Sequence, residues 1–164
     1  MDETTQSGPA GSGWRTLAGF LVLCFAAYGL SGAMTASSVG GWYQQLEKPG
    51  FNPPDWVFAP VWAVLFIAMA VAGARTWHAA GPVRGLAMLA FALQLTLNMA
   101  WTAVFFGLNA TGGAVIVNLL LLAAVCWCTL LFWRRDRIAG SLMAPYALWT
   151  AFALVLSFEI WRLN

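Results

Sequence analysis

Charged side chains are scarce in this sequence. Only 9% of its 164 residues are Asp, Glu, Lys or Arg, whereas 61% are hydrophobic. An average soluble domain carries roughly 25% charged residues, so this chain would have too little polar surface to cover the core of a soluble fold. A lipid bilayer removes the difficulty because it accepts apolar side chains on the outside of a protein. The composition therefore predicts a membrane protein.

Residues that bind metals or nucleic acids are also few. The formal net charge is only +2, and the basic residues stand in short clusters that do not form a nucleic-acid face. His78 is the single histidine, and no metal-ligand spacing, P-loop or dinucleotide fingerprint is present. Cys24, Cys126 and Cys128 lie in apolar runs, and we interpret them as small buried hydrophobic residues. We expect no metal site, no required cofactor and no nucleic-acid partner.

Long hydrophobic runs are what the sequence has in abundance. A helix of about 20 residues crosses a hydrocarbon core of about 30 Å. The runs are continuous and not alternating, which favours helices over the strands of a membrane barrel. Five of them meet the length requirement, at 17–36, 56–77, 85–106, 112–133 and 138–161. The sequence predicts an all-α integral membrane protein, with a disordered polar tail at 1–16 and one five-helix transmembrane domain at 17–164.

The connections between these runs predict a lid and an orientation. The loop at 37–55 is the longest, and it contains Trp42, Tyr43 and three prolines, which favours an ordered lid. Six arginines fall at one side of the five predicted spans, against Lys48 and Arg162 at the other. The positive-inside rule then places the N-terminus in the cytoplasm and the lid outside. This orientation assumes insertion into a bacterial-type plasma (inner) membrane, which is the more natural place for a helical bundle, and the outer membrane is the alternative.

Tryptophan is unusually frequent, with ten residues in the chain. Those at the ends of the predicted spans are typical of the aromatic belt at a membrane interface. An indole N–H deep in hydrocarbon needs a partner or a ligand. The tryptophans that lie inside the spans are Trp62, Trp101, Trp127 and Trp149.

Polar and aromatic side chains recur on one face of three predicted helices. In the third span, Gln94, Asn98 and Trp101 share a face at helical spacing. Two interpretations remain for them: hydrogen bonds between helices, or the lining of a ligand cavity. Similar faces carry Trp62 and Phe66 in the second span, and Tyr146, Trp149 and Ala153 in the fifth. Such stripes form either a packed core or a cavity for a large planar apolar molecule.

Three blocks of sequence resemble the TspO/MBR family, which comprises tryptophan-rich sensory proteins and translocator proteins, also called peripheral-type benzodiazepine receptors. The likeness covers about residues 17–164. The blocks are Trp42-Tyr43 with Leu46-Glu47-Lys48-Pro49, Asn52-Pro53-Pro54 and Pro60-Val61-Trp62; Gln94 to Gly107; and Pro145 to Trp149 with Ala153 and Trp161 to Asn164.

The resemblance implies five transmembrane helices around a pocket that the first loop caps. It implies a tetrapyrrole ligand, protoporphyrin IX or haem, and a role in porphyrin handling, transport or light and oxidative-stress sensing. Some family members bind sterols, which we do not infer here because Phe158 stands where a Tyr is expected. The resemblance also implies a homodimer. The alternatives are a photo-oxidative porphyrin-degrading enzyme and a regulatory membrane protein that acts through a partner.

Residue by residue, the resemblance places Trp62 and Trp149 at the paired tryptophans linked to porphyrin photochemistry, which are the candidate catalytic positions. The residues expected to bind the ligand, from the resemblance and from the shared helix faces together, are Trp42, Tyr43, Phe66, Gln94, Asn98, Trp101, Tyr146 and Ala153.

Overall fold

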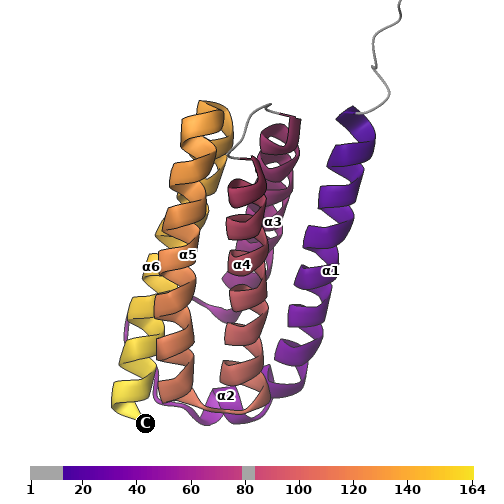
Figure 1. Cartoon of the computed structure of the whole chain (residues 1–164). Helices are drawn as coiled ribbons and strands as arrows, with labels where there is room; N and C mark the ends of the chain where they lie inside the picture. Colours follow the sequence, from indigo (N-terminus) through magenta and orange to yellow (C-terminus); the bar gives the residue numbers. More distant parts are fainter. Residues whose placement is uncertain (1–12, 79–83) are drawn as a thin grey trace, which may run out of the picture.

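The computed structural model describes residues 13–78 and 84–164, and it forms a bundle of five long helices in these ranges (Figure 1). All five are long and apolar enough to cross a membrane, which confirms the predicted fold class. The helices are α1 (Gly13–Val39), α3 (Asp55–His78), α4 (Arg84–Thr102), α5 (Thr111–Arg135) and α6 (Arg137–Leu163), with the π-helix η1 (Ala103–Gly107) at the end of α4 and the short α2 (Trp42–Gln45) between α1 and α3.

Each hydrophobic run lies inside one helix or, for the third, inside α4 and η1 together, and the helices extend beyond the runs at both ends. Residues 13–16 are already helical in α1, so the expectation of a disordered tail at 1–16 is wrong for these four residues. Residues 1–12 lie outside the described ranges. The loop expected at 37–55 is shorter because α1 continues to Val39. An apolar run marks the segment inside hydrocarbon, whereas helical backbone hydrogen bonds can continue into the polar interface.

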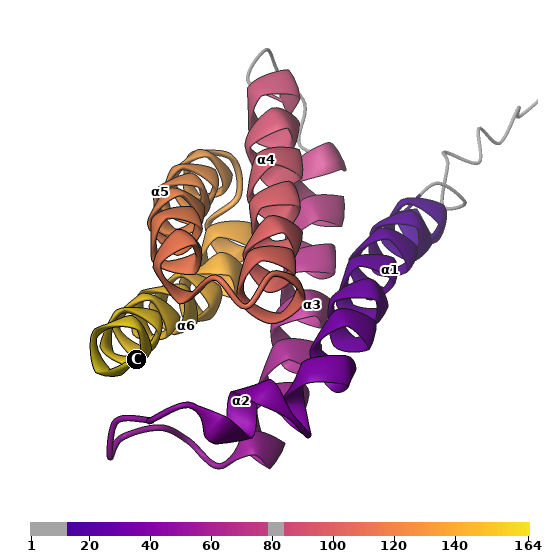
Figure 2. The same cartoon turned by 90° about the horizontal axis from the view of Figure 1, so that it is seen from below.

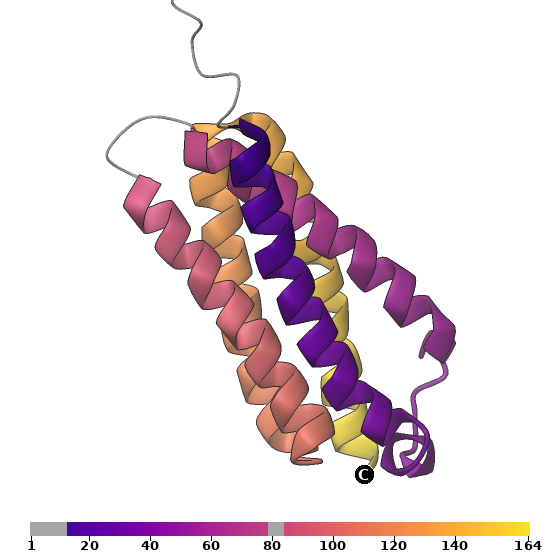
Figure 3. The same ribbon diagram turned by 90° about the vertical axis from the view of Figure 1, so that its right-hand side faces the viewer.

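The long helices are packed in the ring order α1, α3, α6, α5, α4, and the ring closes where α4 meets α1 (Figure 2). Only 11% of the residues in the most apolar stretch of α1 are buried inside the protein, against 28–39% for the other four. Figure 3 shows α1 in front of the bundle, with α3 on one side and α4 on the other. Helix α1 is therefore the least embedded wall, and its seam with α4 is the loosest.

The three cysteines do not all behave as expected. Cys24 and Cys128 are buried, but Cys126 is exposed on the outer face of α5, so the interpretation of this residue as a buried hydrophobe is wrong. Two positions along a helix correspond to a rotation of about 200°, which turns Cys126 outward when Cys128 faces the core.

At one end of the bundle, a single residue connects α5 and α6. The Asp136 carboxylate accepts hydrogen bonds from the backbone N–H groups of Ile138 and Ala139 at 2.8 and 3.3 Å, and from Arg75 Nε at 2.7 Å. Burial alone would raise the pKa of Asp136, but the hydrogen bonds from Arg75 and the two N–H groups lower it on balance. This helix cap therefore also ties α3 to the α5–α6 turn.

Candidate ligand cavity

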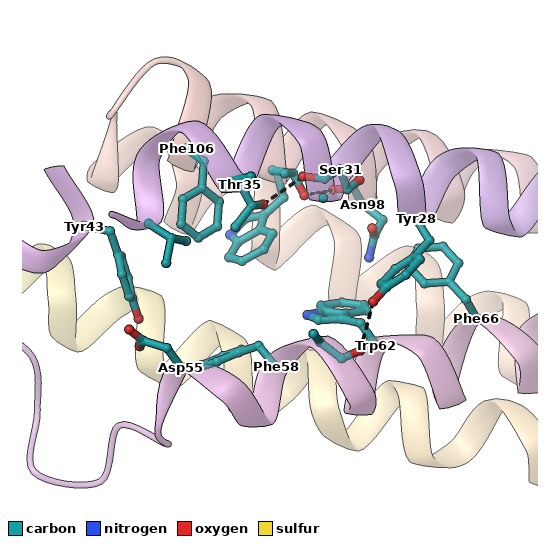
Figure 4. A pocket seen from close by; sticks show the side chains of 16 residues that line it. Tyr28, Ser31, Thr35, Tyr43, Asp55, Phe58, Trp62, Phe66, Asn98 and Phe106 are labelled. Carbon is teal, nitrogen blue, oxygen red and sulfur yellow. Dashed lines mark hydrogen bonds between the residues drawn. The ribbon is translucent and has the colours of Figure 1, made fainter. Parts of the chain in front are cut away.

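A cavity of about 320 Å³ lies at the loose seam of the ring, between α1, α3 and α4 and beneath the lid. Figure 4 shows Tyr43, Phe58, Trp62 and Phe106 around it. Most of its wall is apolar or aromatic. The side chains that matter for its chemistry are Tyr28, Ser31 and Thr35 of α1, Tyr43 of the lid, Asp55, Phe58, Trp62 and Phe66 of α3, and Asn98, Trp101 and Phe106 of α4 and η1.

Trp62 is the central aromatic residue of the cavity wall. Its ring centroid lies 5.9 Å from that of Phe66 and 6.1 Å from that of Tyr146. Trp149 meets it edge-on, with centroids 6.4 Å apart and planes at 89°. Trp149 and Tyr146 do not line the cavity but form a layer behind Trp62, toward α6. This packing holds the Trp62 indole in one orientation while leaving part of it facing the cavity.

Two hydrogen bonds hold polar groups at the cavity wall. Asn98 Nδ2 donates to the Tyr146 hydroxyl at 3.1 Å, and this bond joins α4 to α6 inside the bundle. The Tyr28 hydroxyl donates to the carbonyl oxygen of Ala59 at 3.1 Å, and so joins α1 to α3 directly before Pro60. Both bonds join two different helices. For Asn98 this agrees with one of the two interpretations drawn from the sequence, a hydrogen bond between helices.

Two other polar atoms at the cavity are left without partners. Ser31 Oγ and Trp101 Nε1 are buried, and neither forms a hydrogen bond within the described residues. Both residues line the cavity. Because buried polar groups in proteins are nearly always satisfied, unpaired groups at a cavity wall indicate a place for a bound polar atom.

The lid covers one end of the cavity with Tyr43. This side chain is buried against Phe106, with centroids 5.7 Å apart, and its hydroxyl donates to Asn52 Oδ1 at 3.4 Å. The Lys48 ammonium lies 4.3 Å from the centre of the Tyr43 ring. Burial, followed by the negative charge of Asp55, raises the pKa of Tyr43 to about 12. The lid thus presents a neutral phenol to the cavity at physiological pH.

A polar latch joins the lid to the end of α6. The backbone N–H of Glu47 donates to Asn164 Oδ1, and Asn164 Nδ2 donates back to the Glu47 carbonyl, both at 3.0 Å. The same Nδ2 also donates to the Ile160 carbonyl at 2.8 Å, which orients the Asn164 amide. A second tie comes from Gln44 Nε2, which donates to Asp55 Oδ2 at 2.8 Å. These contacts hold the lid closed over the cavity.

The π-helix η1 places two neighbouring phenylalanines on the inner side of the bundle. Its wider turn is marked by the hydrogen bond from Leu108 N to Ala103 O at 2.9 Å. Phe105 is buried against Trp42 of the lid, with centroids 5.6 Å apart, while Phe106 lines the cavity. Short π-helical turns are frequent at functional sites. Here the turn provides Phe105, on which the lid packs, and Phe106, which forms part of the cavity wall.

Comparisons with known proteins all point to the same family. The TspO/MBR family model matches residues 20–162. The chain is 39% identical to the protein CrtK of Rhodobacter capsulatus, over 88% of this chain and 90% of that protein. It is 36% identical to the tryptophan-rich protein TspO of Chlorobaculum tepidum, over 91% and 96%, and 36% identical to the human translocator protein, over 75% of each. The chain belongs to the TspO/MBR family.

The cavity of this TspO/MBR protein includes only some of the residues expected from the sequence. Tyr43, Phe66, Asn98, Trp101 and the photochemical candidate Trp62 line it. The other expected residues lie elsewhere: Trp42 belongs to the lid and packs on Phe105, Tyr146 and Trp149 stand behind Trp62, Gln94 is fully buried, and Ala153 is half-buried on α6. Both amide atoms of Gln94 lack a hydrogen-bond partner within 13–78 and 84–164.

The contribution of α1 to this TspO/MBR cavity was missed in the sequence. Tyr28, Ser31 and Thr35 recur at helical spacing and line the cavity from α1. The spacing argument applied to the third span would have found them. Their signal in the sequence is weak because hydroxyl groups are less distinctive than amides within an apolar run, and because α1 has no tryptophan within that run.

Proposed function

We propose that this membrane protein binds a tetrapyrrole, such as protoporphyrin IX or haem, in the cavity beneath the lid, and serves porphyrin handling, transport or sensing. The observation that carries the proposal is the pairing of aromatic walls with unsatisfied polar groups. Trp62, Phe58 and Phe106 offer ring faces and edges, and Ser31 Oγ and Trp101 Nε1 are buried without partners in the described chain.

The chemistry of a tetrapyrrole suits this arrangement. Its ring is flat and apolar, so it can stack on aromatic side chains, a contact worth about 0.5–1.5 kcal/mol beyond burial. Its acidic propionates need polar surroundings, which the lid end offers through Lys48. The ammonium of Lys48 lies on the Tyr43 ring, directly over the residue that closes the cavity.

The cavity must widen to hold such a ligand. Its volume of about 320 Å³ is at the lower end of the range for small-molecule sites, roughly 300–1,000 Å³. Helix α1 is the wall that can yield, because it is the least buried of the five and its seam with α4 is the loosest. The proposal therefore includes an outward shift of α1 when the ligand enters.

A titration of detergent-purified protein with protoporphyrin IX tests the proposal. Porphyrin absorbance is the better signal, since replacing a tryptophan would also remove a fluorescence reporter. We expect saturable binding, and a Kd about 3- to 10-fold higher in Trp62→Leu, from the loss of an aromatic contact. Trp127→Leu is the matched control, because Trp127 is exposed on α5 and does not line the cavity. Non-saturable binding, or equal Kd values in both variants, would contradict the proposal.

A second candidate function is light-dependent degradation of the bound ring by dioxygen. The observation that favours it is the edge contact between Trp62 and Trp149, which places a second electron-rich indole directly behind the one at the cavity wall. Under illumination with dioxygen, we expect the porphyrin spectrum to give way to that of an open-chain product. Trp62→Phe and Trp149→Phe should each slow this change. If both variants match the parent protein, the tryptophans have no part in such chemistry.

For the membrane orientation, we propose a plasma membrane with the start of α1 in the cytoplasm. Arg15, Arg75, Arg84 and the cluster Arg134 to Arg137 belong to one end of the bundle, and the positive-inside rule supports this end as cytoplasmic. Alkaline phosphatase fused after Asn164 should then be active in a bacterial host. If instead the phosphatase fusion is inactive and a C-terminal fusion to green fluorescent protein is fluorescent, the protein has the opposite orientation.

A further inference from the structure

A second hollow lies at the opposite end of the bundle from the lid. It is a surface groove of about 390 Å³ between the first turns of α1 and the last turn of α3. Its walls are Arg15, Thr16, Gly19, Phe20, Leu23 and Trp77. None of these six residues lines the cavity beneath the lid, so the groove is a separate site.

The shape of the groove comes from two glycines. A Cβ atom at Gly73 of α3 would lie 2.6 Å from the ring of Phe20, so the absence of a side chain there lets α1 pack closely on α3. The Phe20 ring is also in edge contact with Trp77, at a centroid distance of 6.4 Å. Gly19 has the opposite surroundings, since a Cβ there would meet no atom of the described residues within 4 Å. The groove is thus open at Gly19 and has a firmly packed aromatic wall.

The groove is basic at its interfacial end. Arg15 forms part of the wall, and the guanidinium of Arg84 lies 5.0 Å from the centre of the Trp77 ring. One arginine therefore lines this short stretch of surface and a second packs on its Trp77 wall, and no acidic residue within 13–78 and 84–164 lines it. Among the residues that the structure describes, the acid at this end of the bundle is Asp136, and its carboxylate is already paired with Arg75 at 2.7 Å. Arginine is well suited to phosphate because its planar group can donate two hydrogen bonds at once.

The other part of the groove is apolar and continues onto the outer surface of α1. Leu23 is 49% exposed and its neighbour Val22 is 70% exposed, on a helix that faces lipid. Trp77 lies near the end of the α3 span, the depth at which tryptophans gather at the membrane interface. A free phosphate ion would use the arginines but leave Phe20 and Leu23 without a role. A molecule with a phosphate head and an acyl chain uses both parts.

We propose that this groove is a binding site for an anionic glycerophospholipid. Its phosphate contacts Arg15 and Arg84 beside Trp77, and one acyl chain lies along Phe20 and Leu23. Basic pockets between transmembrane helices are known to recognise anionic lipid head groups. The site is independent of the proposed tetrapyrrole function, since it has its own walls and lies at the other end of the bundle.

Native mass spectrometry of the full chain in detergent tests the proposal, with lipid adducts counted directly. Dioleoyl phosphatidylglycerol and dioleoyl phosphatidylcholine have the same acyl chains and differ in the charge of the head group. We expect the parent protein to retain phosphatidylglycerol at least about tenfold more tightly. The double variant Arg15→Gln/Arg84→Gln should lose this preference, whereas Arg134→Gln, which removes an exposed arginine at the same end outside the groove, should keep it.

A variant that keeps both charges tests the shape of the site. Gly19→Leu should fill the open part of the groove and weaken phosphatidylglycerol binding severalfold, and it should not unfold the helix because a Cβ at this position meets no atom within 4 Å in the part of the chain that the structure describes. Equal retention of the two lipids, or an equal loss in the double variant and in Arg134→Gln, would overturn the proposal. Displacement of the lipid by millimolar inorganic phosphate would also overturn it, since the groove would then be a site for the ion alone.

Discussion

The latch between the lid and the end of α6 should govern how often the lid opens. Asn164→Ala removes both hydrogen bonds that join Asn164 to Glu47. Each such bond contributes about 0.5–1.5 kcal/mol net, and exposed groups belong at the lower end of that range. The two together are worth about 1–2 kcal/mol. Since about 1.4 kcal/mol corresponds to tenfold, the open state should become about 5- to 30-fold more populated.

Hydrogen–deuterium exchange at the Glu47 amide measures this directly, because that N–H is one of the two latch donors. Exchange in Asn164→Ala should accelerate by the same 5- to 30-fold. Asn164→Asp keeps the oxygen that accepts from Glu47 but loses the donor, so its effect should be intermediate. Arg162→Gln is the control, since Arg162 pairs with Glu159 and not with the lid. If exchange in Asn164→Ala equals that in Arg162→Gln, the latch does not hold the lid.

Three other changes test the packing and the charges of the bundle. Tyr146→Phe leaves the buried amide of Asn98 without its acceptor and should lower stability by about 1–2 kcal/mol; an unchanged Tm in detergent would contradict this. Gly140→Ala sets a Cβ 2.6 Å from the Cα of Trp133 and should lower stability by about 1–3 kcal/mol in the same assay, whereas a higher Tm would refute the clash. The pKa of Asp136 is lowered in the folded protein, so its contribution to stability is present above about pH 4 and lost as the pH falls below that value. Asp136→Asn should therefore flatten the acid limb of a stability–pH profile, and an unchanged limb would show that the carboxylate contributes nothing.

Hydropathy was sufficient for the helices, because a helix satisfies its own backbone hydrogen bonds and needs only enough apolar residues to cross lipid. The ends of the helices were less predictable. Gly13 and Val39 lie outside the apolar run of the first span, yet both are helical. The π-helix at Ala103–Gly107 left no signal in the sequence, since it depends on how the turn after Thr102 packs against the lid and α1.

The sequence predicted the kinds of side chain at the candidate site, but not which of them reach the cavity. Trp62 and Asn98 could be recognised from periodicity and from the family resemblance, and both line the cavity. Trp149 has equally strong sequence signals but stands behind Trp62. Periodicity places a residue on the inner side of its own helix, whereas the rotation and depth of neighbouring helices decide whether it reaches a cavity.

The sequence by itself determined that this is a five-helix membrane protein with a lid, because transfer into lipid is a local property of each apolar segment. Only the tertiary structure decided that α1 forms the loose wall of the cavity, that Asn164 holds the lid, and that Arg15 and Arg84 flank one groove. These features join residues far apart in the chain. They arise from the packing of one helix against another, which cannot be predicted from any single stretch of sequence.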